Sequence, residues 1–505
     1  MEGTDRSRLK RSRLKTRIAK PSDISIWNDV NQNGVLLEVL RRLKRLEDHC
    51  GLEKSPDIDE DADSPMTFSS VDSDTSRPVS LDKSHAPTMP GVIGDYYESY
   101  QFEGFKIPLE KSFLLSIPDL LENPHIQLDY TSQIIYHTVR LQGIILDPGS
   151  HKDNGGLITN LYRKCFALTD CWLDHIQNTY ADLFVAVSMS LEACNSEVAW
   201  KMLGHACTIA KALGYFSVDG NPGETNGQPS LSQGSIIGET ETDKNRKRFE
   251  FWHLLRTDCL FRLSFGKPTL MPAGSWKVNF PDPTITGVDD ESSRFIQIHF
   301  LASMRLALVV MKYLDWADAG PDPDPVLHDT TVDSFLEEVQ LIMSDWDTDE
   351  LLRMAKTQID TWFCVDMVFS SYKFLIVLHQ SKKSDQDRHK LPHQAVDISR
   401  KSIKMFQSLL GSSLHGFWGI SLILLHQFIP FFILCLDIIG NPERGDLETD
   451  LTSVTWITDY VEKIVEERSE LRPVMIIMKA MILACHQVKT NHLTSSMTGN
   501  ELAGY

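Results

Sequence analysis

Apolar residues recur every three or four positions along most of the chain from about residue 96 to the C-terminus. This spacing predicts amphipathic helices, and alternating strand patterns are scarce. No unit of 34 to 47 residues repeats along the chain, which argues against a helical solenoid. We therefore expect an all-α fold, with one large multi-helix domain over residues 96–505. The expected helices are 157–178, 180–194, 196–214, 244–265, 291–316, 331–343, 351–379, 394–410, 415–439, 450–468 and 471–488.

Residues 1–34 are expected to form a disordered basic tail and a polar linker. The sequence Arg-Ser-Arg-Leu-Lys occurs twice in succession, at 6–10 and 11–15, and a five-residue period matches neither a helix nor a strand. The pattern favours contact with DNA phosphates or nuclear import, and a solvated tail without a partner is the alternative. The basic residues are Arg6, Arg8, Lys10, Arg11, Arg13, Lys15, Arg17 and Lys20.

Residues 35–50 are predicted to form a short coiled-coil helix. Its seam is Leu36, Val39, Leu43 and Leu46, at spacings of three, four and three. Two heptads are marginal by themselves, because short isolated helices are weak in water. The segment is therefore either a dimerisation helix or an amphipathic helix packed on its own chain, and the sequence leaves both open.

Residues 51–95 are rich in Asp, Glu, Ser and Pro, which predicts a disordered acidic linker. Four aspartates alternate between Asp57 and Asp63, as in a calcium-binding loop. Such a loop needs a glycine and a distal bidentate glutamate, whereas position 68 is Phe. We reject a calcium site here.

Charge is unevenly distributed over the 505 residues. The net charge is −19, yet residues 1–20 carry +6, which leaves −25 for the other 485 residues. An acidic body repels phosphate, so any contact with nucleic acid is expected at the N-terminus. The nine cysteines are scattered, begin at Cys50 and include no CxxC pair, which is typical of reduced thiols in an intracellular protein.

Segment 417–436 is uncharged and long enough to cross a bilayer. His426 and Gln427 lie near its middle, Pro430 would break a helix there, and no cluster of Lys or Arg flanks it. We expect a core helix and no membrane contact. The N-terminus carries no apolar stretch after its basic residues, so a secretory signal is not expected either.

Motifs for catalysis and cofactor binding are mostly missing from the sequence: GxSxG, HExxH, GxGxxG and the P-loop do not occur. Cys165, Cys171 and His175 have helical spacing, but no fourth zinc ligand lies nearby. Asp345 and Asp349 have the spacing of the metal-binding aspartates of terpene cyclases, and the paired start of that motif is missing. We expect helix-start or loop acids here and at Asp289 and Asp290, no metal, no cofactor and no enzymatic activity.

Two motif blocks carry a resemblance to a known family. The first is a small-residue helix that ends at Leu-Gly, with Gly204, Ala206, Ala210 and Gly214. Its pattern predicts close helix packing and a stop at the last glycine. The second block runs without a gap from a basic pair to Gly-Lys-Pro. It consists of Lys247, Arg248, Phe251, Trp252, Asp258, Gly266 and Pro268.

These blocks resemble the middle homology region of fungal zinc binuclear cluster transcription factors, most clearly over 180–280. Lys267 stands where that family usually has Arg, and Cys259 where Arg usually follows the Asp. An i to i+4 pair between Asp258 and Arg262 is one expectation, and a different basic partner is the other. No cysteine precedes Cys50, so we do not expect the family's six-cysteine zinc cluster within this sequence. Either the cluster was lost or the sequence is truncated, and both stay open.

The resemblance implies a nuclear transcription regulator, with pathway-specific control of a fungal secondary-metabolite gene cluster. DNA contact would come weakly from the basic tail or from a homo- or heterodimer partner, and a small-molecule effector would act on the body. The alternative is an enzyme or ligand-binding protein built on the same helical body and acting in the same biosynthetic pathway.

Overall fold

A computed structural model describes residues 106–146, 155–220, 239–282, 291–320, 324–348, 358–383, 391–411, 426–466 and 468–501, with a few positions in 91–97 and at 350 and 353. The basic tail and the 35–50 seam lie outside the described residues, as does the acidic linker up to residue 90. Residues 91, 93 and 94 of that linker are helical, and Ile93 is only 1% exposed. The globular body therefore begins slightly earlier than the sequence suggested.

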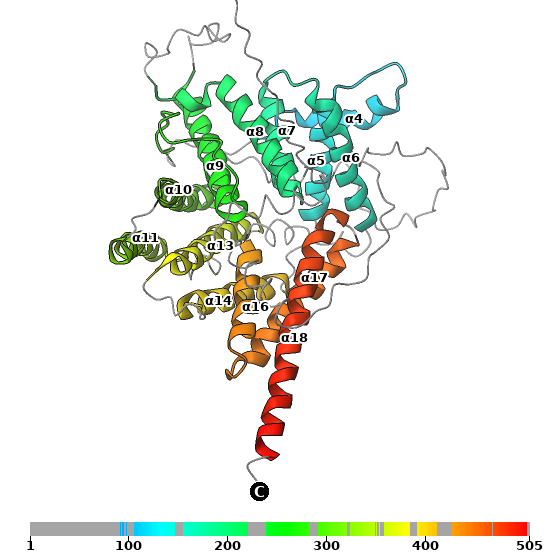
Figure 1. Cartoon of the computed structure of the whole chain (residues 1–505). Coiled ribbons are helices and arrows are strands. Elements are labelled where there is room, and N and C mark those ends of the chain that lie inside the picture. Colours follow the sequence, from blue (N-terminus) through cyan, green and yellow to red (C-terminus); the bar gives the residue numbers. More distant parts are fainter. Residues whose placement is uncertain are drawn as a thin grey trace, which may run out of the picture.

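The described part of the chain is all-helical and contains no strand, as the pattern predicted (Figure 1). Its α-helices are α4 (Lys111–Glu122), α5 (Tyr130–Leu146), α6 (Gly155–Leu173), α7 (Tyr180–Glu192), α8 (Ser196–Ala212), α9 (Glu241–Phe265), α10 (Glu291–Asp318), α11 (Pro325–Asp345), α13 (Gln358–Ser381), α14 (His393–Gly411), α16 (Phe428–Gly440), α17 (Leu447–Val465) and α18 (Arg472–Glu501).

Side-chain caps fix the starts of several helices. The Thr179 hydroxyl accepts a hydrogen bond from the amide of Asp182, whose carboxylate accepts one from the Thr179 amide, which is a capping box for α7. Thr240 and Asp243 form the same box at α9. The Asn195 side chain caps α8 by accepting hydrogen bonds from the amides of Glu197 and Val198. These caps satisfy amide groups that the first helical turn leaves without partners.

The described residues form two large hydrophobic cores and a small third cluster between α5 and α6. One large core is built mainly by α4 to α9, and the other mainly by α10 to α18. Helices α9 and α10 contribute to both: Phe251 and Met304 lie in the first core, and Cys259 and Leu306 in the second. Figure 1 shows the two groups one above the other, with α18 (red) running away from the body at the lower end. The pair α9 and α10 therefore holds the two halves together.

Helices α4 and α5 were not among the helices we expected. In α5, residues 134–139 are all buried, so no polar face marks a helical period. In α4, Pro118 interrupts the sequence pattern, although the helix continues through it. Helix α11 begins at Pro325, earlier than the expected residue 331, because Asp324 caps it and proline fits the first helical position.

The suspected membrane segment becomes in part a core helix. Of 417–436, residues 417–425 lie outside the described residues, and 428–436 form most of α16, whose Phe431 and Leu434 are completely buried. Pro430 stands in the first turn, where a proline is tolerated. One described helix is long and apolar enough to cross a membrane, Ser469–Asn491, and a single such helix is weak evidence for crossing.

Candidate functional site

The first motif block lies on α8 and its exit. Ala206 and Ala210 are completely buried, as close packing requires. Gly204 is different, because a Cβ added there would meet Leu270 only at 3.8 Å, which is an ordinary contact. The close approach expected at Gly204 is therefore not observed. Gly214 follows the end of α8 with φ +82°, a left-handed conformation that favours glycine.

The basic pair of the second block faces inward. The Arg248 guanidinium binds Asp219 through Nε and Nη2, at 3.1 and 2.5 Å, and Glu241 through Nη1 at 2.6 Å. Burial acts to raise the pKa of Asp219, but Arg248 and the Asn279 amide outweigh it and lower that pKa. Lys247 Nζ donates to the Leu213 carbonyl at 3.1 Å and pairs with Glu239 at 2.8 Å. Both cations thus tie α9 to the segment that follows α8.

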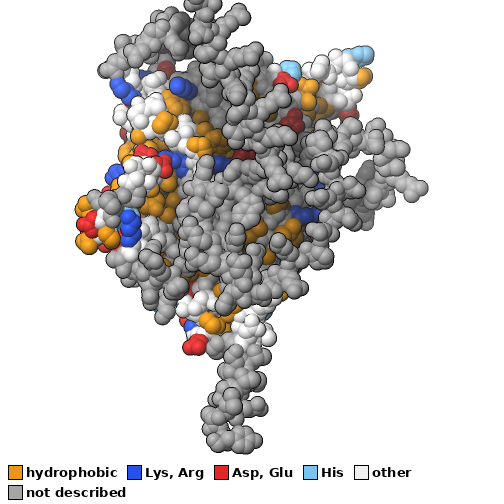
Figure 2. Space-filling view, in the orientation of Figure 1, with side chains coloured by type: hydrophobic (Ala, Val, Ile, Leu, Met, Phe, Trp, Pro, Cys, Tyr) orange, Lys and Arg blue, Asp and Glu red, His pale blue; other side chains and the backbone are white. Residues whose placement is uncertain are grey.

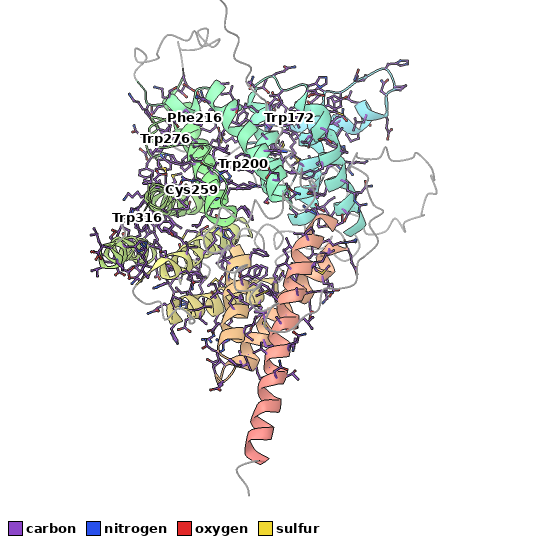
Figure 3. The ribbon with its side chains drawn as sticks, viewed as in Figure 1. Trp172, Trp200, Phe216, Cys259, Trp276 and Trp316 are labelled. Carbon is purple, nitrogen blue, oxygen red and sulfur yellow. The ribbon has the colours of Figure 1, made fainter. Side chains whose placement is uncertain are left out.

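Phe251 and Trp252, the aromatic pair of the block, lie on α9 and hold the segment that follows this helix against it. Phe251 is completely buried and meets Phe216 edge to face, at 5.5 Å between ring centroids. Trp252 stacks on Phe280 at 4.6 Å, and its indole N–H donates to the Asn279 carbonyl at 2.9 Å. Trp276 contacts both rings of the pair. Figure 3 shows Phe216 and Trp276 close together beside α9.

Asp258 holds the chain that leaves α9. Its carboxylate accepts hydrogen bonds from the amides of Leu270 and Met271, both at 3.1 Å, and from the Thr269 hydroxyl at 3.2 Å. The expected pair with Arg262 is not formed, because Arg262 turns to Asp315 and Asp318 on α10, at 3.3 and 3.0 Å. Burial raises the pKa of Asp258, and the three donors and the nearby charge of Arg262 act against it without outweighing it.

Gly266 ends α9 with φ +62°, and Pro268 follows on the surface. Between them, Lys267 is 8% exposed and pairs with Glu197 on α8 at 2.5 Å. The second block is therefore a brace, by which we mean the contacts of its basic, aromatic and acidic residues that fasten segments 213–220 and 266–282 onto α9. The side chains of the block are thus used in packing.

A buried polar centre lies where α9, α13 and α16 approach one another. Arg256 of α9 pairs with Asp366 of α13. The other oxygen of that carboxylate lies 3.0 Å from Nε2 of His426, just before α16. Lys373 lies seven positions, or about two helical turns, further along α13. Its side chain is 1% exposed and donates to the Ser264 hydroxyl at 2.7 Å. Three basic side chains thus surround one acid inside the protein.

The electrostatics of this centre follow from burial and pairing. Burial acts to raise the pKa of Asp366, but Arg256 and His426 outweigh it and hold that pKa well below its usual value. Burial lowers the pKa of Lys373 to about 7, against the attraction of Asp366. Burial, followed by the charge of Arg256, also lowers the pKa of His253 to about 3. With a pKa of about 7, Lys373 exchanges its proton near neutral pH.

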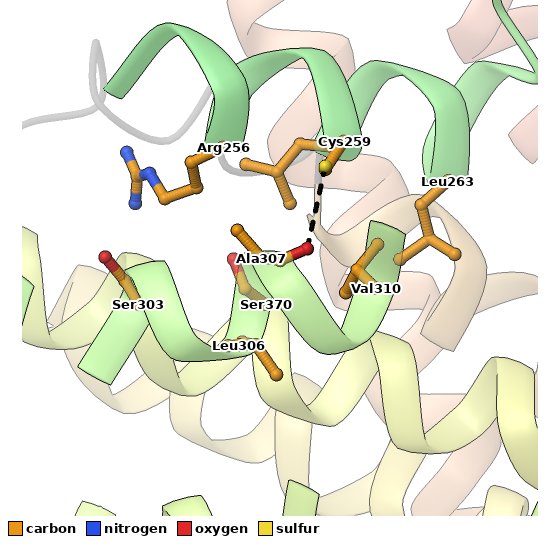
Figure 4. Close-up of a pocket in the computed structure, with 9 residues that line it drawn as sticks. Arg256, Cys259, Leu263, Ser303, Leu306, Ala307, Val310 and Ser370 are labelled. Atoms are coloured by element: carbon orange, nitrogen blue, oxygen red, sulfur yellow. Dashed lines mark hydrogen bonds between the residues drawn. The ribbon is translucent and has the colours of Figure 1, made fainter. Parts of the chain in front are cut away.

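A small cavity of about 10 Å³ adjoins the centre (Figure 4). It is lined by α9, α10 and α13, through Arg256, Cys259, Leu263, Ser303, Val310 and Ser370 among others. Arg256 Nε and Ser370 Oγ have no hydrogen-bond partner among the described residues. The Ser303 hydroxyl donates to the Phe300 carbonyl at 2.8 Å. The volume accommodates one water-sized group, which these polar atoms could bind.

The other candidates for chemistry are not brought together. Cys165 is completely buried beside Thr138, whereas Cys171 and His175 are exposed, with His175 Nδ1 2.7 Å from the Cys171 carbonyl. No group of three potential metal ligands occurs among the described residues.

We expected the acids at 345–350 to lie at a helix start or in a loop, but Asp345 lies at the end of a helix. Asp345 is the last residue of α11 and lies 3.3 Å from Arg305. The chain then turns, with φ +44° at Asp347, so the spacing of one helix face does not continue to Asp349. Asp289, Asp290 and Asp349 lie outside the described residues.

Comparisons of the chain with models of protein families, with curated proteins and with solved structures found no match. The resemblance in the two motif blocks therefore stays a prediction.

The buried polar centre was missed at the level of sequence. Its signal was two charged residues, Asp366 and Lys373, set seven positions apart in an otherwise uncharged stretch of α13. That spacing puts both on one helix face. The partners Arg256 and His426 come from distant segments and carry no comparable signal.

Proposed function

We propose that this chain is a transcription regulator that acts in the nucleus on a fungal metabolic gene cluster. The observation that carries the proposal is the gap-free second block, from Lys247 to Pro268, on a helical body that follows a basic tail. The proposal is supported by the packing roles of the block's basic, aromatic and acidic residues, Lys247, Arg248, Phe251, Trp252 and Asp258, which require these residue types at this spacing. DNA contact would come from residues 6–20 or from a dimer partner.

The basic tail can be tested directly with the full chain. Replacing its eight Lys and Arg residues with Ala should abolish weak binding to a DNA duplex of arbitrary sequence in a mobility-shift assay. For the unaltered chain, affinity should fall steeply with salt, with a slope on a log–log plot set by the number of phosphates contacted. Tight binding to one sequence by the purified chain alone would contradict the partner model.

Gene deletion followed by transcript profiling tests the regulatory role. Loss of transcripts from a set of neighbouring biosynthetic genes is the expected result. An effector of the body, if one acts, would change those transcripts without changing the amount of this protein.

A second candidate is an enzyme or ligand-binding protein on the same helical body. The observation behind it is the buried polar centre, where Lys373 has its pKa lowered by burial to about 7 and a small cavity lies beside Arg256. Deletion should then remove a pathway metabolite while transcript levels stay unchanged. A Lys373→Met variant that restores the metabolite as well as the unaltered gene does would exclude this role.

A further inference from the structure

A polar seam runs along the contact between α9 and α13. Asp366, Ser370 and Lys373 follow spacings of four and three, so they lie on one face of α13. At one end of the seam, Asp366 binds Arg256 of α9. At the other end, Lys373 donates to Ser264 of the same helix. The cavity of Figure 4 lies between these two contacts, and Ser370 forms part of its wall.

Two polar groups in the wall of the cavity lack a partner. Arg256 Nε and Ser370 Oγ form no hydrogen bond with any described residue. Both groups are buried, since Ser370 is 5% exposed and the Arg256 side chain is 12% exposed. A buried polar group without a partner destabilises the protein, because it has given up its hydrogen bonds to solvent. A ligand shared by the two groups would remove this cost.

Ser303 of α10 adds an acceptor to the same wall. Its hydroxyl hydrogen is used in the bond to the Phe300 carbonyl at 2.8 Å, so its oxygen can only accept a further bond. Figure 4 shows Arg256 on α9 facing Ser303 on α10. The wall thus offers a charged donor, the Ser370 hydroxyl, which donates or accepts, and an oxygen that only accepts. A ligand that suits all three must both accept and donate hydrogen bonds.

We propose that this cavity binds one water molecule, which accepts hydrogen bonds from Arg256 and Ser370 and donates one to Ser303. The cavity volume of about 10 Å³ is close to the space that one water molecule needs. Three polar partners are also the usual number for a buried water. The water completes the hydrogen bonds of the polar seam and connects α9, α10 and α13 at the junction of the two halves.

A monatomic anion such as chloride fits this site less well. An anion accepts hydrogen bonds but has none to donate to Ser303. The charge of Arg256 is already matched by Asp366, and burial lowers the pKa of Lys373 to about 7, so little positive charge is left over above that pH. Most of the wall consists of leucine, valine and alanine side chains, which do not compensate a buried negative charge.

A crystal structure of the full chain, grown in the presence of sodium bromide, tests the proposal directly. We expect one density peak of the size of a water within about 3.2 Å of both Arg256 Nε and Ser370 Oγ. This peak should give no anomalous signal at the bromine absorption edge. An anomalous peak would identify an anion and overturn the proposal. A protein side chain in that position, or a cavity without density, would overturn it as well.

Two substitutions of equal size give a test in solution. Ser370→Thr and Ser370→Val add the same bulk to the cavity wall, but only threonine keeps the hydroxyl group. If the hydroxyl binds a water, Ser370→Thr should unfold at a temperature roughly 2–4 °C above that of Ser370→Val. Equal midpoints, or a higher midpoint for Ser370→Val, would show that the hydroxyl has no partner and would contradict the proposal.

The matched control is the same pair of substitutions at Ser334 on α11. This helix lies at the surface, at the left edge of the space-filling view (Figure 2). Ser334 is exposed, and its hydroxyl donates to the Thr331 carbonyl at 2.7 Å. Ser334→Thr and Ser334→Val should therefore unfold within about 1 °C of each other. A difference as large as that at Ser370 would assign the effect to the helix backbone and contradict a bound water.

Discussion

His426 Nε2 lies 3.0 Å from one carboxylate oxygen of Asp366, while Arg256 binds the other oxygen. The three residues come from segments before α16, on α13 and on α9, so the carboxylate joins the two halves of the fold. Asp366 is 6% exposed and His426 is 2% exposed. A buried charge of this kind persists only where partners satisfy it, and here one acid serves two bases.

Replacing Asp366 with Ala should destabilise the protein by about 3–5 kcal/mol, because Arg256 would be left buried without its counter-charge. Urea unfolding measures the difference. The control is Asp333→Ala, an exposed partner of Lys382, which should cost less than about 1 kcal/mol. The double variant Arg256→Met/Asp366→Leu should be more stable than Asp366→Ala. A loss below about 1 kcal/mol for Asp366→Ala would contradict this account.

Lys373→Met should stabilise the protein at pH 7, by roughly 2–4 kcal/mol, because burial disfavours the ammonium form. The folded protein loses this proton near pH 7, whereas an unfolded chain keeps it until near pH 10.5. The unfolded state therefore binds more protons in that window, and stability of the unaltered protein should rise with pH there. Unfolding at pH 7 and pH 9 tests this. The exposed Lys479→Met should not remove the rise.

His137 on α5 should make the protein less stable in mild acid. Burial, followed by the charges of Lys164 and Arg140, lowers its pKa from 6.5 to about 4. Between these values the unfolded chain binds the proton and the folded protein does not, so stability falls as the pH drops, by up to about 1.4 kcal/mol per pH unit. His137→Leu should flatten the curve between pH 6.5 and 4.5. His393→Gln, at an exposed site, should leave the curve as steep as before.

Gly214→Ala should destabilise the protein by about 1 kcal/mol through backbone strain alone. An added Cβ would meet nothing within 4 Å, but φ is +82°. Gly156 gives the matched comparison, because its added Cβ is equally free and its φ is ordinary. Gly156→Ala in α6 should be neutral or stabilising by up to about 1 kcal/mol. Equal thermal shifts for the two variants would contradict a conformational role for Gly214.

The helical class could be predicted because exposed helices such as α14 keep a polar face, and their period is visible in the sequence. The individual helix α5 was not predicted, because Ile134 to Val139 are all buried and no alternation of polar and apolar faces shows the helical period. Residues of the second motif block were found because they lie close together along the chain. Their partners, such as Asp219 and Asn279, lie on the flanking segments and could be found only from the folded structure.

The same limit applies to Asp258. An i to i+4 cation was the nearest partner that a sequence could suggest, yet backbone amides at Leu270 and Met271 hold the carboxylate. Sequence patterns contain no information on where a backbone amide becomes available after a helix ends. The buried polar centre is harder still, since Arg256 and Asp366 are 110 positions apart.

Substitutions of Arg248 in the brace should change the stability of the protein but not the proposed contact with DNA. Arg248→Lys should cost about 1–2 kcal/mol, because a lysine cannot bind Asp219 and Glu241 at once through a planar fork. Arg248→Met should cost more, since Asp219 would lose its main partner. The control Arg353→Lys changes an exposed pair with Glu350 and should stay within about 0.5 kcal/mol. The proposed contact with DNA rests on residues 6–20 and not on the brace. At a temperature where Arg248→Lys is folded, its binding to a DNA duplex should therefore equal that of the unaltered chain. Weaker binding by the folded variant would place Arg248 in the DNA contact and contradict a structural role.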